Sequence, residues 1–460
     1  MSMLPVAPPL PIPKSADTMR RWSDTEKRYQ VLHGDWHNVL QDAINKSVGT
    51  QRTREWVDMD RSTNLLRWMA EGRAVLYDRD PVISHDDAGA LEFMQALLQA
   101  AGHTAFSQQL ERDVIGLRDM FVRPHVYKEE DGKIRLSLRL VYPHRVEAGS
   151  DPNQPQIPRW LEETVWGVRP GTEKEEWTVH RIDIDRREYT VRTSDREDVT
   201  AIYLDSEYSG DGFYYVANGR PFMPYVHFPA ARAPVMFDYT AEVELYEGTL
   251  AVAGNMSHWR HAMYRTSWSQ RWAIDIELAA DADVVEPGDR HPRNSVVADP
   301  ATVLMFDSKA DGRGQPQIGQ WETPVDVLKM MEGIHSQMRL IVGSAGAAAP
   351  EFLRTSGDPR SGYALEISRD GQRTISERMA PIRRTPDELL LSTIAAMVNL
   401  IDPKIALPVD GWSIRYRALK LSPDEREKKI AEILQLLDKG IYTAVEARQK
   451  IERIDEDTLL

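Results

Sequence analysis

The chain has 460 residues, no cysteine and a net charge of −14, with 42% hydrophobic and 28% charged residues. The lack of cysteine excludes disulfides and thiolate chemistry. The balance of apolar and charged residues predicts a globular protein of several domains, and no apolar run approaches the ~20 residues of a membrane span. The negative charge argues against tight binding of duplex DNA, because such binding depends on a basic face that neutralises phosphates.

The first half of the chain predicts a short arm followed by an α+β domain. Residues 1–14 begin with a proline-rich, uncharged stretch, which predicts a disordered arm and lacks the basic start of a signal peptide. Within residues 15–241, helical spacing of apolar residues comes first. Strand-like alternation follows around the turn dipeptide at 131–132, an acidic loop is expected at 147–156, and more strands are expected at 164–203.

The next region predicts an amphipathic helix that leads into a small β module. Residues 242–273 carry apolar and aromatic side chains at helical spacing, with Trp268 and Trp272 as an i, i+4 pair. Residues 274–322 are charged and rich in turn formers. Within them, strand-like residues near 315–321 are expected to pair with the partly alternating segment that ends at Phe306.

A second amphipathic helix is expected at 323–342, on the other side of the β module. Thr323 and Pro324 form a helix start, with Asp326 in the position of a capping-box acid. Small residues and a proline end this helix, and a loop follows at 343–360. Small side chains have little surface to bury, so packing is not expected to hold the loop rigid.

A long helix, a strand and two shorter helices complete the chain. The long helix opens at Ser361 and is expected to break at Pro381, because proline cannot donate a backbone hydrogen bond. A capping box from Thr385 to Glu388 then restarts it. Residues 412–418 alternate as in a strand, and residues 421–460 carry the caps and apolar faces of two helices.

The order of helix, small-residue loop and the Ser361-Gly362-Tyr363-Ala364-Leu365 helix start resembles the core of the portal proteins of tailed bacteriophages. The two helices around a small β module, and the final succession of strand and helices, are similar to the same family. The resemblance implies an α+β portal fold. Its parts would be an α/β wing at 15–241, stem helices at 242–273 and 323–342, a clip at 274–322, a channel (tunnel) loop at 343–360, a long kinked helix with the return strand of the wing at 361–420, and a helical C-terminal crown at 421–460.

The same resemblance implies a function. Portal proteins form a dodecameric ring at one capsid vertex, the head-tail connector through which viral DNA is packaged and ejected. This homo-oligomer would bind the passing double-stranded DNA weakly and dock terminase, major capsid protein, scaffold and head-completion or tail proteins. It would have no catalytic residue, cofactor or metal, since the packaging ATPase is a separate protein. The implied location is the virion, with assembly in the host cytoplasm and no membrane.

The resemblance also implies two groups of site residues. In the channel loop these are Ser344, Glu351, Arg354, Ser356, Asp358 and Arg360. In the clip, the residues expected to contact terminase or adaptor proteins are Arg290, Arg293, Lys309 and Arg313. Taken without the resemblance, Arg354 and Arg360 fit a surface loop of mixed charge as well as they fit contacts to DNA phosphates. An acidic channel would let DNA slide rather than bind.

A few motifs fit metal or nucleotide binding poorly. His33 and His37 would share a face of one helix and could bind zinc, but no acid follows at a metalloenzyme spacing. Asp307 begins a sequence like a calcium loop, in which Lys309 occupies a ligand position. The glycines that begin at Gly343 lack the ending of a phosphate-binding loop and follow a helix rather than a strand.

Two rival functions remain open at the level of sequence. One is a soluble, hydrolase-like enzyme whose dispersed acids meet only in the fold. Its adjacent acids, Asp183 with Asp185 and Glu162 with Glu163, fit solvated strand and loop faces better than a catalytic pair. The other rival is a different structural protein of a phage head or tail, against which the order of helix, β module, helix, loop and long helix argues.

Overall fold

The computed structural model shows an α+β protein. It describes residues 14–48, 59–151, 153–204, 213–233, 235–237, 245–267, 270–274, 276–278, 306–308, 317–321, 326–344, 362–417, 423–439 and 441–455. Within these ranges, none of the helices is both long and apolar enough to cross a membrane. The α+β class expected from the sequence is confirmed.

The chain divides into two compact units, each built from several stretches of sequence. Unit 1 contains Met1–Trp36, Asn64–Tyr246 and Leu340–Leu460. Unit 2 contains His37–Thr63 and Glu247–Arg339. The stretch His37–Thr63, which the sequence analysis placed inside the N-terminal α/β domain, therefore belongs with the helices and strands around the β module.

Unit 1 is organised around two antiparallel sheets. The first has the strand order β10-β2-β3, formed by Val226–Pro229, Asp119–Lys128 and Ile134–Val141. The second has the order β4-β5-β6-β7, formed by Val146–Asp151, Gln154–Val168, Glu175–Asp183 and Glu188–Thr193. The β2–β3 turn uses Gly132 at φ +82°, as expected for an Asp-Gly hairpin.

The acidic loop expected at 147–156 is wrong, because most of this segment forms a strand pair. Val146 pairs with Glu163 and Asp151 pairs with Gln154, so β4 and β5 make a hairpin. The acids of this segment lie on the strands themselves. Their charges are balanced by tertiary partners: Lys14 contacts Glu147 and Glu162, which lie opposite each other in the register.

Helices cover the first sheet and fill the core of unit 1. They are α1 (Ala16–His33), α4 (Leu65–Arg73), α5 (Ala88–Ala100), α6 (His103–Leu117) and α9 (Gly362–Ile401). Helix α1 begins at the cap Ser15, whose side chain accepts from the Thr18 amide, and ends where Gly34 takes the left-handed conformation at φ +89°. Helices α1 and α6 touch closely, because Gly116 of α6 leaves room for the buried side chain of Leu32.

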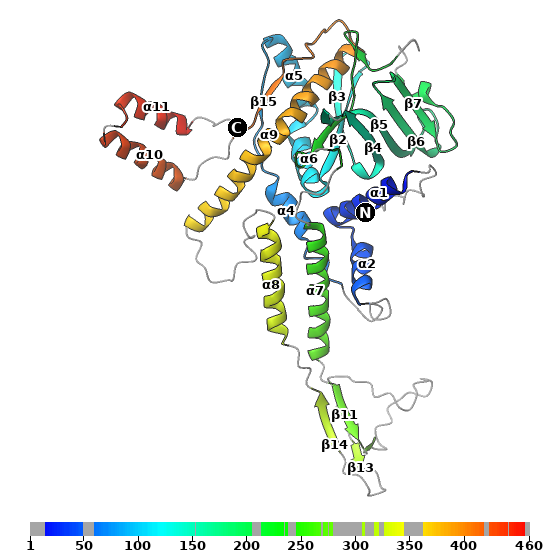
Figure 1. Cartoon of the computed structure of the whole chain (residues 1–460), viewed down its shortest axis with the longest axis vertical. Helices are drawn as coiled ribbons and strands as arrows, with labels where there is room; N and C mark the ends of the chain where they lie inside the picture. Colours follow the sequence, from blue (N-terminus) through cyan, green and yellow to red (C-terminus); the bar gives the residue numbers. More distant parts are fainter. Residues whose placement is uncertain are drawn as a thin grey trace. The chain divides into compact units, whose positions relative to one another are not determined.

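Helix α9 runs without a break from Gly362 to Ile401, with Pro381 and Pro386 both inside it. The interruption expected near Pro381 is therefore wrong. The helix lies along β2 and β10, which Figure 1 shows as an orange helix across the first sheet. Its buried apolar residues include Leu390, Ile394 and Val398. Tertiary packing of this face offsets the hydrogen bonds that the two prolines cannot make.

Shorter elements complete unit 1. A two-stranded sheet joins β1 (Val82–Ser84) to β15 (Ser413–Arg415), and another joins β8 (Val216–Ala217) to β9 (Arg220–Pro221). The 3-10 turns η1 and η2 cover Pro143–Arg145 and Thr200–Tyr203. The C-terminal helices are α10 (Pro423–Asp438) and α11 (Ala444–Asp455). Thr443 and Glu446 exchange side-chain-to-backbone hydrogen bonds, so the capping box expected for the last helix is confirmed.

Unit 2 contains a pair of long helices and short strands beyond their ends. Its elements are α2 (His37–Val48), α7 (Leu245–Ser267), β11 (Gln270–Ile274), β12 (Ile276–Leu278), β13 (Phe306–Ser308), β14 (Gln317–Trp321) and α8 (Val327–Ser344). Helices α7 and α8 each have a few residues that belong to unit 1. Strand β14 pairs with β11, and β13 pairs with β12. The segment expected to pair with 315–321 lies outside the described residues except for Phe306, which pairs with Leu278, so that expected pairing stays a prediction.

The structure corrects two expectations in this region, one for Trp272 and one for Asp326. Trp272 lies in β11 opposite Gly319, so it cannot form a helical pair with Trp268, which lies outside the described residues. Helix α8 begins after Asp326, whose carboxylate accepts from the Lys329 amide at 3.1 Å. Asp326 is therefore the cap itself rather than the capping-box acid.

Two glycine-to-alanine changes in unit 1 should alter the stability of the fold in opposite directions. A Cβ added at Gly116 would lie 2.6 Å from Leu32 Cδ2, and Leu32 is buried, so Gly116→Ala should destabilise the fold by about 1–3 kcal/mol. Gly72, exposed in α4, has no atom within 4 Å of an added Cβ. Gly72→Ala should stabilise it by about 0.5–1 kcal/mol. Urea unfolding measures both, and a loss of stability on Gly72→Ala would contradict this packing.

Candidate functional site

A buried carboxylate holds the middle of α9 to the rest of unit 1. Asp387 is 2% exposed, and its Oδ2 accepts hydrogen bonds from Tyr77 Oη at 2.6 Å and from the Tyr416 hydroxyl. The two tyrosine rings meet edge to face with centroids 5.7 Å apart. The capping box expected from Thr385 to Glu388 is wrong, because these residues lie in the middle of α9 and Glu388 instead accepts a hydrogen bond from the Ile414 amide at 3.4 Å.

Two further charged side chains surround this contact. Arg383, fully buried one turn before Asp387, donates to the backbone oxygen of Pro229 at 2.7 Å. Glu111 of α6 is buried and accepts from the Leu76 amide through both oxygens, at 3.0 and 3.2 Å. We call Tyr77, Glu111, Arg383, Asp387 and Tyr416 the α9 clamp. Because the clamp is closed to solvent, it positions α9 and cannot act on a substrate.

Burial sets the protonation of the two clamp acids. It raises the pKa of Asp387 to about 6, although the two tyrosine hydroxyls and Arg383 oppose the change. It raises the pKa of Glu111 to about 7, against the opposing effects of Arg383 and the Leu76 amide. The clamp cannot be predicted from local sequence patterns, because its residues lie far apart in the chain. The only local feature at Asp387 is an acid followed by a strongly apolar helical run.

The helix pair of unit 2 is joined by polar contacts as well as by packing. Figure 1 shows α7 and α8 side by side, with β11 and β14 continuing from their ends. Trp259 Nε1 donates to the Val327 oxygen at 3.0 Å, and Asn255 Nδ2 donates to Gln337 Oε1 at 2.8 Å. These two contacts lie at different points along the helices, and together they set how α7 and α8 lie against each other.

A buried acid also attaches α7 to the stretch before α4. Asp60 is fully buried, its amide donates to Ser257 Oγ at 2.9 Å, and its Oδ1 lies 2.9 Å from Arg260 Nη2. Asp60 also accepts from the hydroxyls of Ser62 and Thr63. All of these residues belong to unit 2, so Asp60 explains why the stretch before Asn64 is part of that unit.

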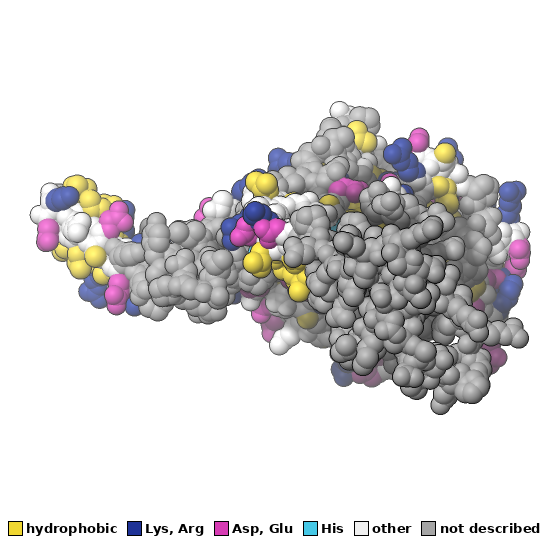
Figure 2. Space-filling model, turned by 90° about the horizontal axis from the view of Figure 1, so that it is seen from below, with side chains coloured by type: hydrophobic (Ala, Val, Ile, Leu, Met, Phe, Trp, Pro, Cys, Tyr) yellow, Lys and Arg dark blue, Asp and Glu magenta, His cyan; other side chains and the backbone are white. Residues whose placement is uncertain are grey.

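Apolar side chains remain exposed on several helices of the single chain. On α8, Leu328 and Leu340 are 78% and 74% exposed. On the C-terminal helices, Leu434 and Val445 are also exposed, and Ala447 is the only described residue of α10 and α11 that is buried. Figure 2 shows hydrophobic side chains alternating with charged ones over these two helices, at the left of the view. Helices with so little buried surface gain stability from further partners.

The expected site residues lie almost entirely outside the described ranges. This holds for Glu351, Arg354, Ser356, Asp358 and Arg360 of the channel loop, and for Arg290, Arg293, Lys309 and Arg313 of the clip. Ser344 is the exception, because it is the last residue of α8. The start of the expected loop, Gly343 and Ser344, is thus helical. The proposed roles of the remaining residues stay predictions.

The alternatives based on metal binding find no support in the described residues. Helix α1 ends at His33 and α2 begins at His37, so the expectation that both histidines share one helix face is wrong. Within the described ranges, no three histidine, aspartate or glutamate side chains gather as a metal site.

The adjacent acids have structural partners. Glu163 is buried against Arg139 at 2.6 Å and accepts from Tyr225 at 2.7 Å. Burial would raise the pKa of Glu163, but Arg139 and Arg123 outweigh it, so that pKa lies below its ordinary value. Glu162, on the opposite face of β5, contacts Lys14. The two glutamates therefore do not form a catalytic pair.

Comparison with known proteins gives distant structural matches. No known protein-family profile matches the chain, and no curated protein matches its sequence. A chain from the virion of a native gene transfer agent (GTA) particle matches with 12% identity and a TM-score of 0.40, over 85% of this chain and 90% of that one. A chain from the neck of an empty GTA particle matches with 14% identity and a TM-score of 0.40, over 84% and 88%. These values are too low to indicate fold or function by themselves.

The buried acid Glu111 predicts a pH-dependent contribution to stability. Its pKa is about 7 in the fold and about 4.3 in an unfolded chain, so between these values the folded state holds more protons. The stability contributed by protonated Glu111 is therefore lost as pH rises through about 7. Relative to Glu111→Gln, the wild type should lose about 3 kcal/mol between pH 4 and pH 8.

Thermal or urea unfolding of both proteins across this pH range measures the difference. Glu92→Gln, at an exposed position of the neighbouring α5, is the matched control, because it removes the same charge without removing a buried group. A constant difference between wild type and Glu111→Gln across the range would contradict this prediction, because it would mean that folding does not change the pKa of Glu111.

Proposed function

We propose that this chain is the subunit of a phage portal, a ring through which double-stranded DNA enters and leaves a capsid at one vertex. The observation that carries the proposal is the helix pair α7 and α8 with strands between them, followed by the long helix α9. This order is the one expected of a stem, a clip and a core helix. The ring would act by its shape and its contacts, without catalytic residues.

The exposure of apolar side chains supports assembly from several copies. Leu328 and Leu340 of α8 face solvent in the single chain, and exposed leucines at such positions are typical of surfaces that another molecule covers. The contacts of Trp259 and Asn255 hold α7 and α8 as one rigid element. A rigid helix pair with apolar residues on its outside is suited to packing side by side with its copies.

The remaining parts of the proposal concern partners. The channel loop 343–360 would line the narrow part of the ring and touch DNA weakly, since its arginines are partly balanced by Glu351 and Asp358. The clip 274–322 would dock terminase during packaging and head-completion proteins afterwards. The wing would contact capsid and scaffold proteins. The dodecameric number of subunits comes from the family resemblance.

Assembly is the first test. Light scattering and negative-stain images of the purified chain should show rings with a mass many times 52.5 kDa. Leu328→Glu, which places a charge at an apolar contact, should shift the population toward smaller species while the fold is kept. The control is Lys329→Glu, at the neighbouring exposed position. A wild type that stays monomeric at micromolar concentration in several salt conditions would overturn the proposal.

DNA transport through the loop is the second test. Replacing Arg354 and Arg360 with a Lys-rich sequence should leave the ring intact. It should slow DNA packaging, because the added positive charge binds the moving DNA. The defect should weaken as salt rises. A packaging assay on assembled proheads measures the length and retention of the DNA. If several such variants package normally, the loop is a surface connection and not part of the channel.

A further inference from the structure

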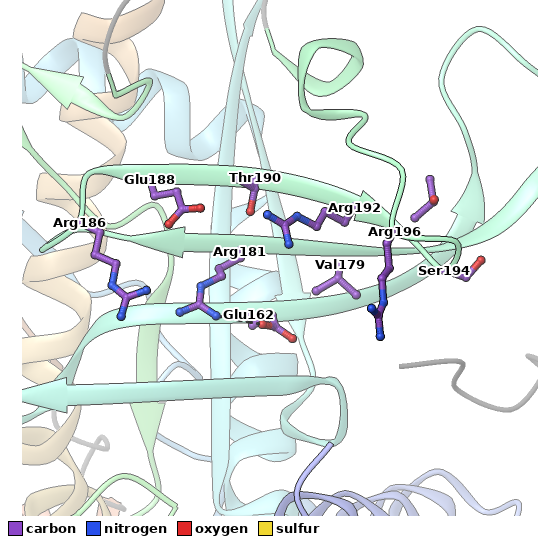
Figure 3. A pocket seen from close by; sticks show the side chains of 10 residues that line it. Glu162, Val179, Arg181, Arg186, Glu188, Thr190, Arg192, Ser194 and Arg196 are labelled. Carbon is purple, nitrogen blue, oxygen red and sulfur yellow. Dashed lines mark ion pairs between the residues drawn. The ribbon is translucent and has the colours of Figure 1, made fainter. Parts of the chain in front are cut away.

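Four arginines line one hollow on the β4-β5-β6-β7 sheet. Arg181 lies on β6 and Arg192 on β7, while Arg186 and Arg196 lie in the turns before and after β7. The hollow has a volume of about 440 Å³. Figure 3 shows these side chains around the three strands β5, β6 and β7. We call it the arginine hollow.

The register of the strands explains why the arginines meet. Arg181 pairs with Thr190 across β6 and β7, and Val179 pairs with Arg192. Side chains two residues apart on a strand share a face, so Arg181 and Arg192 are diagonal neighbours on one side of the sheet. The other side carries His180, which is buried. The arginines therefore lie on the opposite side of the sheet from His180.

The hollow has an excess of positive charge in an acidic chain. Its lining holds two acids, Glu162 and Glu188, against four arginines, and Asp183 lies 3.6 Å from Arg186, so three acids face four arginines and one positive charge is left over. Glu162 is also neutralised from outside, because Lys14 binds it. The whole chain has a net charge of −14, so this local excess is not a consequence of composition. A concave positive site attracts acidic groups and raises their rate of association.

Several guanidinium donors in the hollow are not used by the described part of the chain. Arg181 lies 3.7 Å from Glu162 and 3.9 Å from Asp183, beyond hydrogen-bond distance, and its buried Nε has no acceptor there. Arg192 is exposed and lies near Asp198. Arg196 is exposed too, and its side chain makes no hydrogen bond or ion pair with the described residues. The exposed side chains of Arg192 and Arg196 are placed to receive an acceptor from another molecule.

The backbone at Arg196 adds an independent indication. Arg196 takes the left-handed conformation at φ +64°, in a turn where its amide donates to the Thr193 oxygen at 2.9 Å. Glycine or asparagine adopts this conformation at lower cost than arginine. Residues held in such conformations cluster at functional sites. An arginine at this position costs stability in the fold, which points to a use for its side chain.

We propose that the arginine hollow binds a short acidic segment of a partner protein, whose carboxylates accept charge-assisted, paired hydrogen bonds from the arginines. Glu188 lies among the arginines, and it would repel the continuous row of phosphates in a nucleic acid. A peptide with spaced carboxylates meets the arginines and avoids this acid. This inference does not depend on the proposed function.

The test is fluorescence anisotropy of a labelled peptide, in which glutamate alternates with serine, titrated with the full chain at low salt. The double variant Arg192→Gln/Arg196→Asn should bind it about 100-fold more weakly, at about tenfold for each lost arginine. Arg220→Gln/Arg232→Gln, which removes the same charge at exposed positions outside the hollow, should change the affinity much less. Asparagine suits the backbone at position 196, so the double variant should melt no lower than the wild type.

Three further probes separate the alternatives: the same peptide with glutamine in place of glutamate, a single-stranded DNA of equal length, and inorganic phosphate. The proposal expects none of them to displace the acidic peptide at equal concentration. It is overturned if the double variant binds the acidic peptide as well as the wild type does, or if the control pair loses as much affinity. It is also overturned if DNA or phosphate binds these arginines and the peptide does not.

Discussion

The carboxylate of Asp387 is the interaction on which the arrangement of unit 1 depends. A buried charge is costly unless it is hydrogen-bonded and paired, and Asp387 is satisfied by Tyr77, Tyr416 and Arg383 together. Tyr77 precedes it by 310 residues, so one contact joins the early helical region, the long helix and the strand β15 that follows. The same contact lies inside the continuous helix α9, next to Pro386, which lacks an amide hydrogen.

Unit 2 is stabilised in a different way. Its helices α7 and α8 bury few large apolar side chains and rely on hydrogen bonds from Trp259 and Asn255, with the Asp60 network at one end. Such contacts set the geometry of a helix pair, but each contributes only ~1 kcal/mol to its stability. The exposed leucines of α8 then remain available to neighbours, which is the physical basis for proposing a multi-subunit ring.

The distribution of charge is as informative as its total. Much of the negative charge is balanced within the fold, as at Glu163 with Arg139 and at Glu162 with Lys14. Strand alternation then sends Glu163 toward the core and Glu162 toward the open side, where Arg181 lies. An acidic chain can thus present a positive hollow, because pairing across strands removes some acids from one face and leaves arginines in excess there.

The sequence by itself determined the elements whose signals are local. Helices α5 and α6, the β2–β3 hairpin with Gly132 and the capping box of α11 follow from spacing and turn chemistry within a few residues. It also indicated the order of two helices around a β module, while the expected channel and clip residues stay predictions because most lie outside the described ranges.

Only the tertiary structure decided the features whose partners are distant in sequence. Pro381 breaks an isolated helix, yet α9 continues through it because its apolar face packs on β2 and β10. Residues Thr385 to Glu388 resembled a helix start, yet they lie inside α9, where Asp387 accepts hydrogen bonds from Tyr77 and Tyr416. The arginine hollow depends on strand register, which no local pattern specifies. In each case, a contact between distant segments outweighs a local preference of about one to three kcal/mol.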